Sequence, residues 1–141
     1  MKQVIATVEA PPVLGPYAQA TKVDNTVYVS GQLPLGPNRQ MVGGSIATQT
    51  ERVLLNIQAI LEEAEATLDD VMKINIYMTN LDDFDEMNRV FALFFPNSEN
   101  SRRLPPARSC VEVSRLPKDA TIEMDAIAVV SRGGYADIEP Y

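Results

Sequence analysis

The stretch VLLNIQAILEEAEATLDDVMKINIYMTNLDDFDEMNRVFALF, residues 53–94, places a strand pattern between two helix patterns. Apolar residues recur three and four positions apart from just before this stretch to near Ala66, which predicts an amphipathic helix. These positions are Ile46, Val53, Leu54, Ile57, Ile60, Leu61 and Ala64. Apolar and polar residues then alternate over 74–78, which predicts a half-buried strand. The apolar stripe of a second helix, which ends before Pro96, is Phe84, Met87, Phe91 and Phe94.

Residues that can cap helices precede both helix patterns. Thr48 followed by Glu51 has the spacing of a capping box, although the first helix can also begin at Ser45. Asp82 is the expected cap of the second helix, because its carboxylate can accept a hydrogen bond from the first turn.

Strand patterns flank the central stretch on both sides. Residues 18–30 contain two extended segments around an Asp24-Asn25 turn. Residues 107–113 and 121–130 form two further strand patterns, which only a short connection separates. Two helices among five or six strands predict an α+β sandwich, in which one mixed or antiparallel sheet carries both helices on one face.

The composition of the 141-residue chain bounds its organisation and its chemistry. The length suits one domain, which we expect over 1–132, with a tail over 133–141 that is either weakly ordered or docked on a partner. The chain has no His and one Cys, so it cannot form a Ser-His-Asp or Cys-His relay, a His-ligated zinc site or an internal disulfide. Acid–base chemistry therefore falls to carboxylates, Tyr, Lys, the cysteine or bound water.

Net charge and hydropathy indicate the cellular compartment of the protein and the kinds of partner that it binds. A net charge of −7 gives the chain no general attraction for phosphate backbones, so we expect no nucleic-acid partner. No stretch approaches the ~20 apolar residues of a membrane span, and the N-terminus lacks the apolar segment of a signal peptide. One unpaired cysteine suits a reducing compartment, and we expect a cytoplasmic protein.

Arg108 and Glu123 are the charged pair that the strand patterns single out. Strands joined by a short connection commonly pair antiparallel, and such a pairing places Arg108 opposite Glu123 and Cys110 opposite Thr121. One interpretation is an anion site, because an arginine offers a planar fork that binds a carboxylate through two hydrogen bonds. The other is a structural cross-strand ion pair.

Five other residues are candidates for the same site, each with a structural alternative. Cys110 next to a cation can be a nucleophile, or a small residue that packs in a strand. Tyr17 follows a Gly-Pro turn and can present its phenol to a cleft or simply pack. Ser30 and Gly31 end a strand, where loops often shape pockets, or where only small residues fit. Asn88 lies in the middle of a helix pattern, where it either bonds a neighbouring site or faces solvent.

Four blocks of sequence, read in order, resemble the RidA/YjgF family of enamine/imine deaminases. They are GPYAQA at 15–20, VYVSGQLPL at 27–35, LDDVMKINIYMTNLDDFDEMN at 68–88 and PARSCVEVSRLPKDATIEMDAIAV at 106–129. The resemblance covers about 15–130, and the last block is the most specific. It implies a chorismate-mutase-like α+β fold, assembled as a homotrimer with clefts between subunits. It also implies hydrolysis of 2-aminoacrylate-type enamines and imines to 2-oxo acids and ammonia, without a metal or another cofactor.

The resemblance also implies roles for individual residues. The family's carboxylate-binding arginine falls on Arg108, and its water-positioning glutamate falls on Glu123. The other substrate-binding positions fall on Tyr17, Ser30, Gly31, Asn88 and Cys110. The chain departs from the family at 104–106, where Leu-Pro-Pro stands in place of an aromatic residue before Pro-Ala-Arg.

Two other functions compete with the deaminase. A non-catalytic trimer could bind 2-oxo acids through Arg108 or bind another protein through the same cleft. Ribonuclease activity has also been attached to the family, but an acidic chain without histidine does not favour it.

Overall fold

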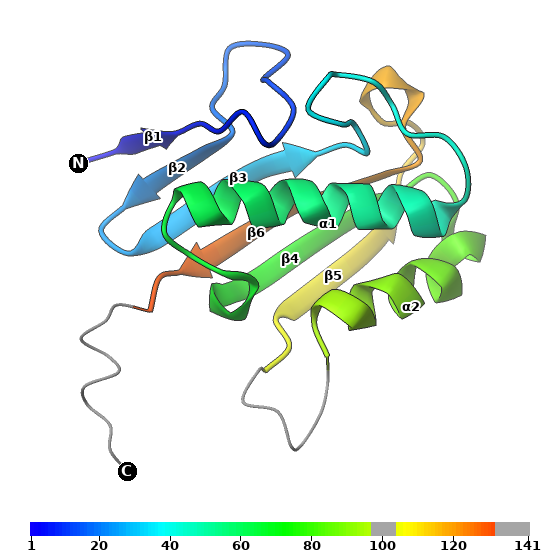
Figure 1. The fold of residues 1–141 in the computed structure, drawn as a ribbon. Helices are drawn as coiled ribbons and strands as arrows, with labels where there is room; N and C mark the ends of the chain where they lie inside the picture. The colour runs from blue at the N-terminus through cyan, green and yellow to red at the C-terminus, as the bar shows by residue number, and fades with distance from the viewer. Residues whose placement is uncertain (97–103, 132–141) are drawn as a thin grey trace.

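Both helices lie on one face of a six-stranded mixed sheet (Figure 1). The computed structural model describes residues 1–96 and 104–131. The helices are α1 (Ile46–Glu63) and α2 (Phe84–Phe94). The strands are β1 (Gln3–Ile5), β2 (Ala20–Val23), β3 (Thr26–Gln32), β4 (Val71–Met78), β5 (Ala107–Glu112) and β6 (Ile122–Val129). The α+β sandwich predicted from the sequence is therefore confirmed.

The strand order is β1-β2-β3-β6-β4-β5, and every neighbouring pair is antiparallel except β4 and β5, which are parallel. The predicted pairing of the last two strands is wrong, because β4 lies between them. The segment that joins them passes the end of β4, where Val113 N donates to the Met78 carbonyl at 2.8 Å and Thr79 N donates to that of Thr121 at 3.1 Å. Crossing two strand spacings takes about 10 Å, which a few extended residues can span, so a short connection did not require neighbouring strands.

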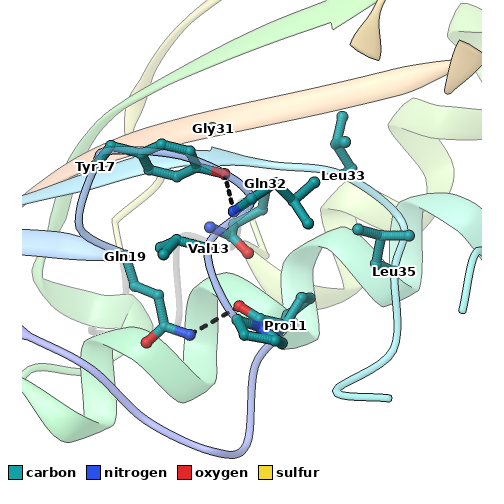
Figure 2. A pocket seen from close by; sticks show the side chains of 10 residues that line it. Pro11, Val13, Tyr17, Gln19, Gly31, Gln32, Leu33 and Leu35 are labelled. Carbon is teal, nitrogen blue, oxygen red and sulfur yellow. Dashed lines mark hydrogen bonds between the residues drawn. The ribbon is translucent and has the colours of Figure 1, made fainter. Parts of the chain in front are cut away.

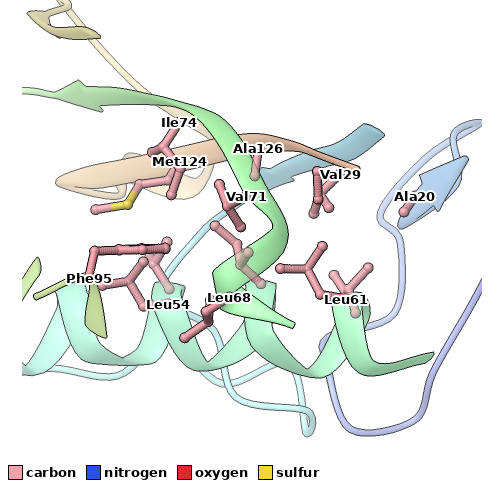
Figure 3. Close-up of a cluster of buried hydrophobic side chains, with 14 of the residues drawn as sticks. Ala20, Val29, Leu54, Leu61, Leu68, Val71, Ile74, Phe95, Met124 and Ala126 are labelled. Carbon is pink, nitrogen blue, oxygen red and sulfur yellow. The ribbon is translucent and has the colours of Figure 1, made fainter. Parts of the chain in front are cut away.

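The core lies between the sheet and the inner face of α1 (Figure 3). The helical positions predicted to be apolar are buried there, and Leu54, Ile57 and Leu61 are fully inaccessible to solvent. The alternation in β4 is also confirmed, since Ile74, Ile76 and Met78 are fully buried under the helices. A strand with such an apolar face gains most stability at the centre of the sheet, where both of its edges are paired.

Helix α1 begins at the earlier of the two predicted caps. Ser45 Oγ accepts a hydrogen bond from Thr48 N at 3.3 Å, so Thr48 lies inside the helix. At the other end, Lys22 from β2 donates to the Ala64 carbonyl at 2.8 Å. A buried ammonium group thus satisfies one of the carbonyls that a helix end leaves unpaired.

The predicted Asp82 cap of α2 is wrong. Asn80 Oδ1 accepts from Asp82 N at 2.9 Å and opens a 3-10 turn over Leu81–Asp83, which leads directly into α2. Asp83 precedes the helix without a side-chain cap bond. The 3-10 turn places its cap at Asn80, ahead of the position expected from the sequence. Sequence spacing alone does not reveal such a turn.

The face of the sheet away from the helices carries both apolar and charged side chains. Val4, Tyr28, Val111 and Val129 are each more than 40% exposed on it. Beside them, Asp125 accepts hydrogen bonds from Asn75 Nδ2 at 2.8 Å and from the Tyr77 hydroxyl at 3.0 Å. Neither described helix has the length and apolar content that a membrane span requires. The predicted tail at 133–141 lies outside the described residues.

Candidate functional site

Glu123 lies against Gly31, on the face of the sheet away from the helices. The pairing of β3 with β6 is irregular between Val29 and Gln32, so β3 bulges beside Glu123. A Cβ atom at Gly31 would overlap Glu123 Oε2 and would lie 2.9 Å from Glu123 Cδ. Only glycine leaves room for the carboxyl group in this position, which explains why Gly31 ends the strand pattern.

Ser30 is tied to the segment just before β2 by its side chain and its backbone. Its hydroxyl donates to the Ala18 carbonyl at 2.6 Å, and its N–H donates to the Gln19 carbonyl at 2.9 Å. The hydroxyl proton is therefore already used, and the hydroxyl oxygen can take part in further hydrogen bonds only as an acceptor. The predicted substrate-binding role of Ser30 would thus be as an acceptor or as a spacer.

Tyr17 lines the same hollow as Gly31 and Glu123. Its hydroxyl accepts from Leu14 N at 3.2 Å, and the side chain is 47% exposed. Gln19 holds the same loop, since its Nε2 donates to the Pro11 carbonyl at 2.8 Å (Figure 2). The cavity drawn in Figure 2 has about 20 Å³, enough for roughly one water molecule.

The larger hollow next to it is the candidate substrate site, and we call it the Glu123 pocket. It has a volume of about 340 Å³ and brings together four of the predicted site residues with three apolar ones. Its lining residues are Leu14, Tyr17, Ser30, Gly31, Leu33, Pro117 and Glu123. Burial raises the pKa of the Glu123 carboxyl above its ordinary value, and the negative charge of Asp125 raises it further. A carboxyl with a raised pKa takes up and returns a proton more readily near neutral pH.

Arg108 belongs to a second pocket, which is built by α2. Its Nη1 donates to Asn88 Oδ1 at 2.6 Å, and its guanidinium carbon lies 4.9 Å from the ring centre of Phe91 and 5.5 Å from that of Phe84. Position 88 is about one turn from position 84 and about one turn from position 91. The three side chains therefore lie on one face of α2, and this face surrounds the guanidinium group. The structure therefore favours the interpretation of Asn88 as a partner of the site rather than as an exposed helix residue.

The second hollow, which we call the Arg108 pocket, has a volume of about 230 Å³. Its lining residues are Asn88, Phe91, Ala92, Phe95, Pro105, Pro106 and Arg108. It shares no residue with the Glu123 pocket.

The two pockets open on opposite faces of the sheet. Arg108 pairs with Ile74, whose buried side chain faces the helices. Glu123 pairs with Tyr77, which is three residues farther along β4 and therefore faces the other side. The predicted Arg108–Glu123 ion pair and the Cys110–Thr121 register are wrong for this reason. One chain does not bring its two principal site residues together.

Cys110 lies in neither pocket. Its Sγ donates to Met78 Sδ at 3.8 Å, and the half-buried side chain packs against the core. Burial raises the pKa of the thiol, and the lowering effect of Arg108 is smaller. A nucleophilic cysteine needs the opposite shift, so packing is the interpretation that the structure favours.

Sequence reasoning missed the residues that surround the candidate ones. Phe84 and Phe91 were assigned to the core stripe of α2, and their i, i+7 spacing around Asn88 was the signal for an arginine contact. Tyr77 and Asp125 had no such signal, because their contact depends on β4 lying beside β6. Among residues 1–96 and 104–131, no three metal-binding side chains cluster.

Comparison with known proteins gives matches over nearly the whole chain. The family model described as Endoribonuclease L-PSP matches residues 7–130. A RutC family protein of Pyrococcus abyssi is 52% identical over 128 residues, which are 90% of this chain and 96% of that protein. The 2-iminobutanoate/2-iminopropanoate deaminase of Escherichia coli K12 is 41% identical over 129 residues, which are 92% of this chain and 98% of that protein.

Solved structures agree with the sequence matches. RidA from the Antarctic bacterium Psychrobacter superposes with a TM-score of 0.82 at 41% identity, over 91% of this chain and 99% of that one. Escherichia coli TdcF, solved with bound serine, superposes with a TM-score of 0.82 at 36% identity, over 90% of this chain and 98% of that one. The chorismate-mutase-like arrangement expected from the sequence is confirmed.

Proposed function

This chain belongs to the RidA (YjgF/RutC) family, and on that premise we propose that it hydrolyses reactive 2-imino and 2-enamino acids to 2-oxo acids and ammonia. The observation that carries the proposal is that the candidate site is divided between two pockets. A pocket with a carboxyl group of raised pKa and a pocket with a positioned guanidinium group supply the two functions that this reaction needs. A relative that is 41% identical is named for this activity.

In the proposed mechanism Arg108 binds the substrate carboxylate. Asn88 and two aromatic rings hold the guanidinium group, so little side-chain freedom is lost when the substrate binds. The C=N carbon of a protonated imine is already electrophilic, and therefore neither a metal nor a covalent nucleophile is required. An enamine first takes a proton on carbon to become the same imine.

Glu123 orients the attacking water and accepts one of its protons as the C–O bond forms. The resulting carbinolamine receives that proton on nitrogen, the C–N bond breaks, and ammonia leaves as the second water proton is released and the C=O bond forms. Protons and electrons balance without any co-reactant. The raised pKa of Glu123 suits both transfers, because the group is neither too weak a base nor too weak an acid.

We further propose that the active unit is a homotrimer, in which the Arg108 pocket of one subunit meets the Glu123 pocket of the next. The two pockets lie on opposite faces of one chain, so a second copy is the direct way to join them. The exposed apolar residues of the helix-free face supply surface for such an association. Light scattering should give a trimer mass at micromolar concentration, and a monomer mass would contradict the shared site.

A mixing experiment tests the activity and the shared site together. Imine is generated in the cuvette by an amino-acid oxidase, and the acceleration of its hydrolysis is measured for wild type, Arg108→Ala, Glu123→Gln and a co-expressed mixture of the two variants. Each variant alone should hydrolyse the imine much more slowly than wild type, while random hybrids should regain about one wild-type site in four. Inactivity of the wild type would contradict the deaminase, and inactivity of verified hybrids would contradict the shared site.

The alternative, a 2-oxo-acid-binding protein without catalysis, rests on the Arg108 pocket alone. Its guanidinium contacts involve no group of the Glu123 pocket. Glu123→Gln separates the two functions, because it should keep 2-oxo acid binding and slow hydrolysis. We expect no ribonuclease activity, since the chain has a net charge of −7 and no histidine.

A further inference from the structure

Gln32 is a buried residue that the proposed mechanism does not use. It ends β3 directly after Gly31, and only 6% of it is exposed. Its Nε2 donates to the Ser30 carbonyl at 3.3 Å, which is the one hydrogen bond of this side chain among the described residues. A carbonyl can only accept, so the amide group turns its NH2 toward Ser30 and its oxygen Oε1 away from it.

The amide oxygen of Gln32 still needs a partner. A buried polar atom that makes no hydrogen bond destabilises a fold, so native proteins satisfy nearly all such atoms. Among side chains in residues 1–96 and 104–131, Thr50 Oγ1 is the atom that lacks a partner and is also closed off from solvent. Gln32 Oε1 does not belong to that class, and a water molecule can therefore reach it.

The space that Gln32 borders is the small cavity drawn in Figure 2. Its volume of about 20 Å³ exceeds the ~10–15 Å³ that one water molecule needs. Its polar lining residues are Tyr17, Gln19 and Gln32. The Gln19 side chain already makes three hydrogen bonds to the backbone of the 7–11 segment. The Tyr17 hydroxyl accepts from Leu14 N, which leaves its own proton to donate.

We propose that this cavity is a specific site for one water molecule, which accepts from the Tyr17 hydroxyl and donates to Gln32 Oε1. The cavity has room for about one water, so a water in it borders both side chains, and two partners are enough to hold it. Tyr17 and Ser30 also line the Glu123 pocket. The water and the Gln32 amide therefore connect two residues of the candidate substrate site.

Gln32 is then a positioning residue for Tyr17. This step rests on the proposed function, with Tyr17 as a predicted substrate contact. The water is distinct from the attacking water, which Glu123 orients. Without it the Tyr17 hydroxyl keeps its bond from Leu14 N, but its proton no longer has a fixed direction. Substrate binding should weaken, while the proton transfers at Glu123 should continue.

Crystal structures of the full chain test the water site directly. In wild type we expect one water within ~3.2 Å of both Tyr17 Oη and Gln32 Oε1. Gln32→Met keeps the length of the side chain but removes the amide oxygen, so this water should be lost. Tyr17→Phe should displace the same water, and its 47% exposed position makes folding secure if Gln32→Met does not fold.

Wild-type protein without this water would overturn the site, as would a water that keeps its place in Gln32→Met or Tyr17→Phe. These structures do not depend on activity. If the wild type hydrolysed no imine, the deaminase would be wrong, and the structures would still decide the water site.

Kinetics test the positioning role. For Gln32→Met we expect KM to rise about threefold to tenfold, as for the loss of one hydrogen bond, with kcat within about twofold of wild type. Tyr17→Phe should raise KM at least as much, and the double variant should be no worse than Tyr17→Phe alone. Gln40→Met, at an exposed glutamine, is the matched control and should behave as wild type. A fall in kcat at constant KM, or additive effects of the two substitutions, would overturn the role of Gln32.

Discussion

The two pockets of this chain are built in different ways. The Glu123 pocket depends on the backbone, because a bulge in β3, a residue without a Cβ and a serine bonded to the segment before β2 fix its shape. The Arg108 pocket depends on side chains, since residues of a single helix hold the guanidinium group against the edge strand β5. Small changes should therefore disrupt the first pocket abruptly and adjust the second one gradually.

This contrast agrees with the chemistry proposed for each side. A proton transfer needs a carboxyl group within hydrogen-bond reach of its water, and a misplacement of about 1 Å can cost a hundredfold in rate. Substrate selection, by contrast, follows from the size and polarity of a pocket, which helix side chains can change without altering the backbone. Four substitutions test the contrast.

The largest effect is expected for Arg108→Lys. Lysine keeps the charge, but one ammonium group cannot both bond Asn88 and hold a carboxylate through two parallel hydrogen bonds. We expect about a tenfold to hundredfold loss of 2-oxo acid affinity. The thermal midpoint should change little, because Arg108 and Glu123 face opposite sides of the sheet.

Arg115→Lys is the matched control, since Arg115 is an exposed arginine paired with Asp119 at 2.8 Å. It should leave both activity and the thermal midpoint unchanged. A variant Arg108→Lys that lost stability and kept activity would show that the arginine is structural and not a clamp.

Gly31→Ala should give the next largest effect. The added Cβ would meet the end of the Glu123 side chain, which can swing away, so the fold should survive while the carboxyl group leaves its position. We expect kcat to fall about tenfold or more at an unchanged melting temperature. Gly43→Ala is the control, because a Cβ at Gly43 meets nothing within 4 Å. Equal activity of the two variants would contradict the close contact between Gly31 and Glu123.

Glu123→Gln should show a small effect on stability that depends on pH. The pKa of Glu123 is raised in the folded protein, so the folded state binds this proton more tightly than the unfolded chain does. The resulting cost to stability is present above the raised pKa and disappears as the pH falls toward the ordinary value near ~4.3. The glutamine variant should thus melt about 1–3 °C higher than wild type at pH 7, and the gap should close at low pH. A pH-independent gap, or a less stable variant at pH 7, would speak against a pKa raised by partial burial of this carboxyl group.

The smallest effect is expected for Cys110→Ser. The thiol donates to Met78 and packs against the core, and its raised pKa leaves little thiolate at neutral pH. Serine is close in size, so kcat should stay within about twofold of wild type, with a modest loss of stability from a half-buried hydroxyl. Complete loss of imine hydrolysis in a folded variant would show that Cys110 takes part in the mechanism.

Local patterns predicted much of this fold, and non-local pairing explains where they failed. Helix α1 and strand β4 follow from the spacing of apolar residues, which depends only on the local geometry of a helix or strand. The partner of β5 could not be predicted from the spacing of apolar residues. The sequences of two strands do not show whether a third strand lies between them. The same error placed Arg108 beside Glu123.

The structure distributes the predicted site residues over two places, and their roles stay predictions. Tyr17, Ser30, Gly31 and Glu123 line one pocket, while Asn88 and Arg108 line another, and Cys110 lies in neither. Residue types and family motifs identify the members of a site. The face of the sheet on which each one lies is set by long-range register, which the sequence does not state.

The central position of β6 has a consequence for synthesis on the ribosome. Among the strands of the described residues β6 is the last to be made, yet it lies between β3 and β4. Until residues 122–129 leave the exit tunnel, the strands already made belong to a three-stranded meander, which α1 follows, and to a β4-α2-β5 unit, and each has an open strand edge. Closure of the sheet and placement of Glu123 then occur in one late step. A chain truncated before this strand would therefore lack its proton-handling group and would expose two edges that favour aggregation.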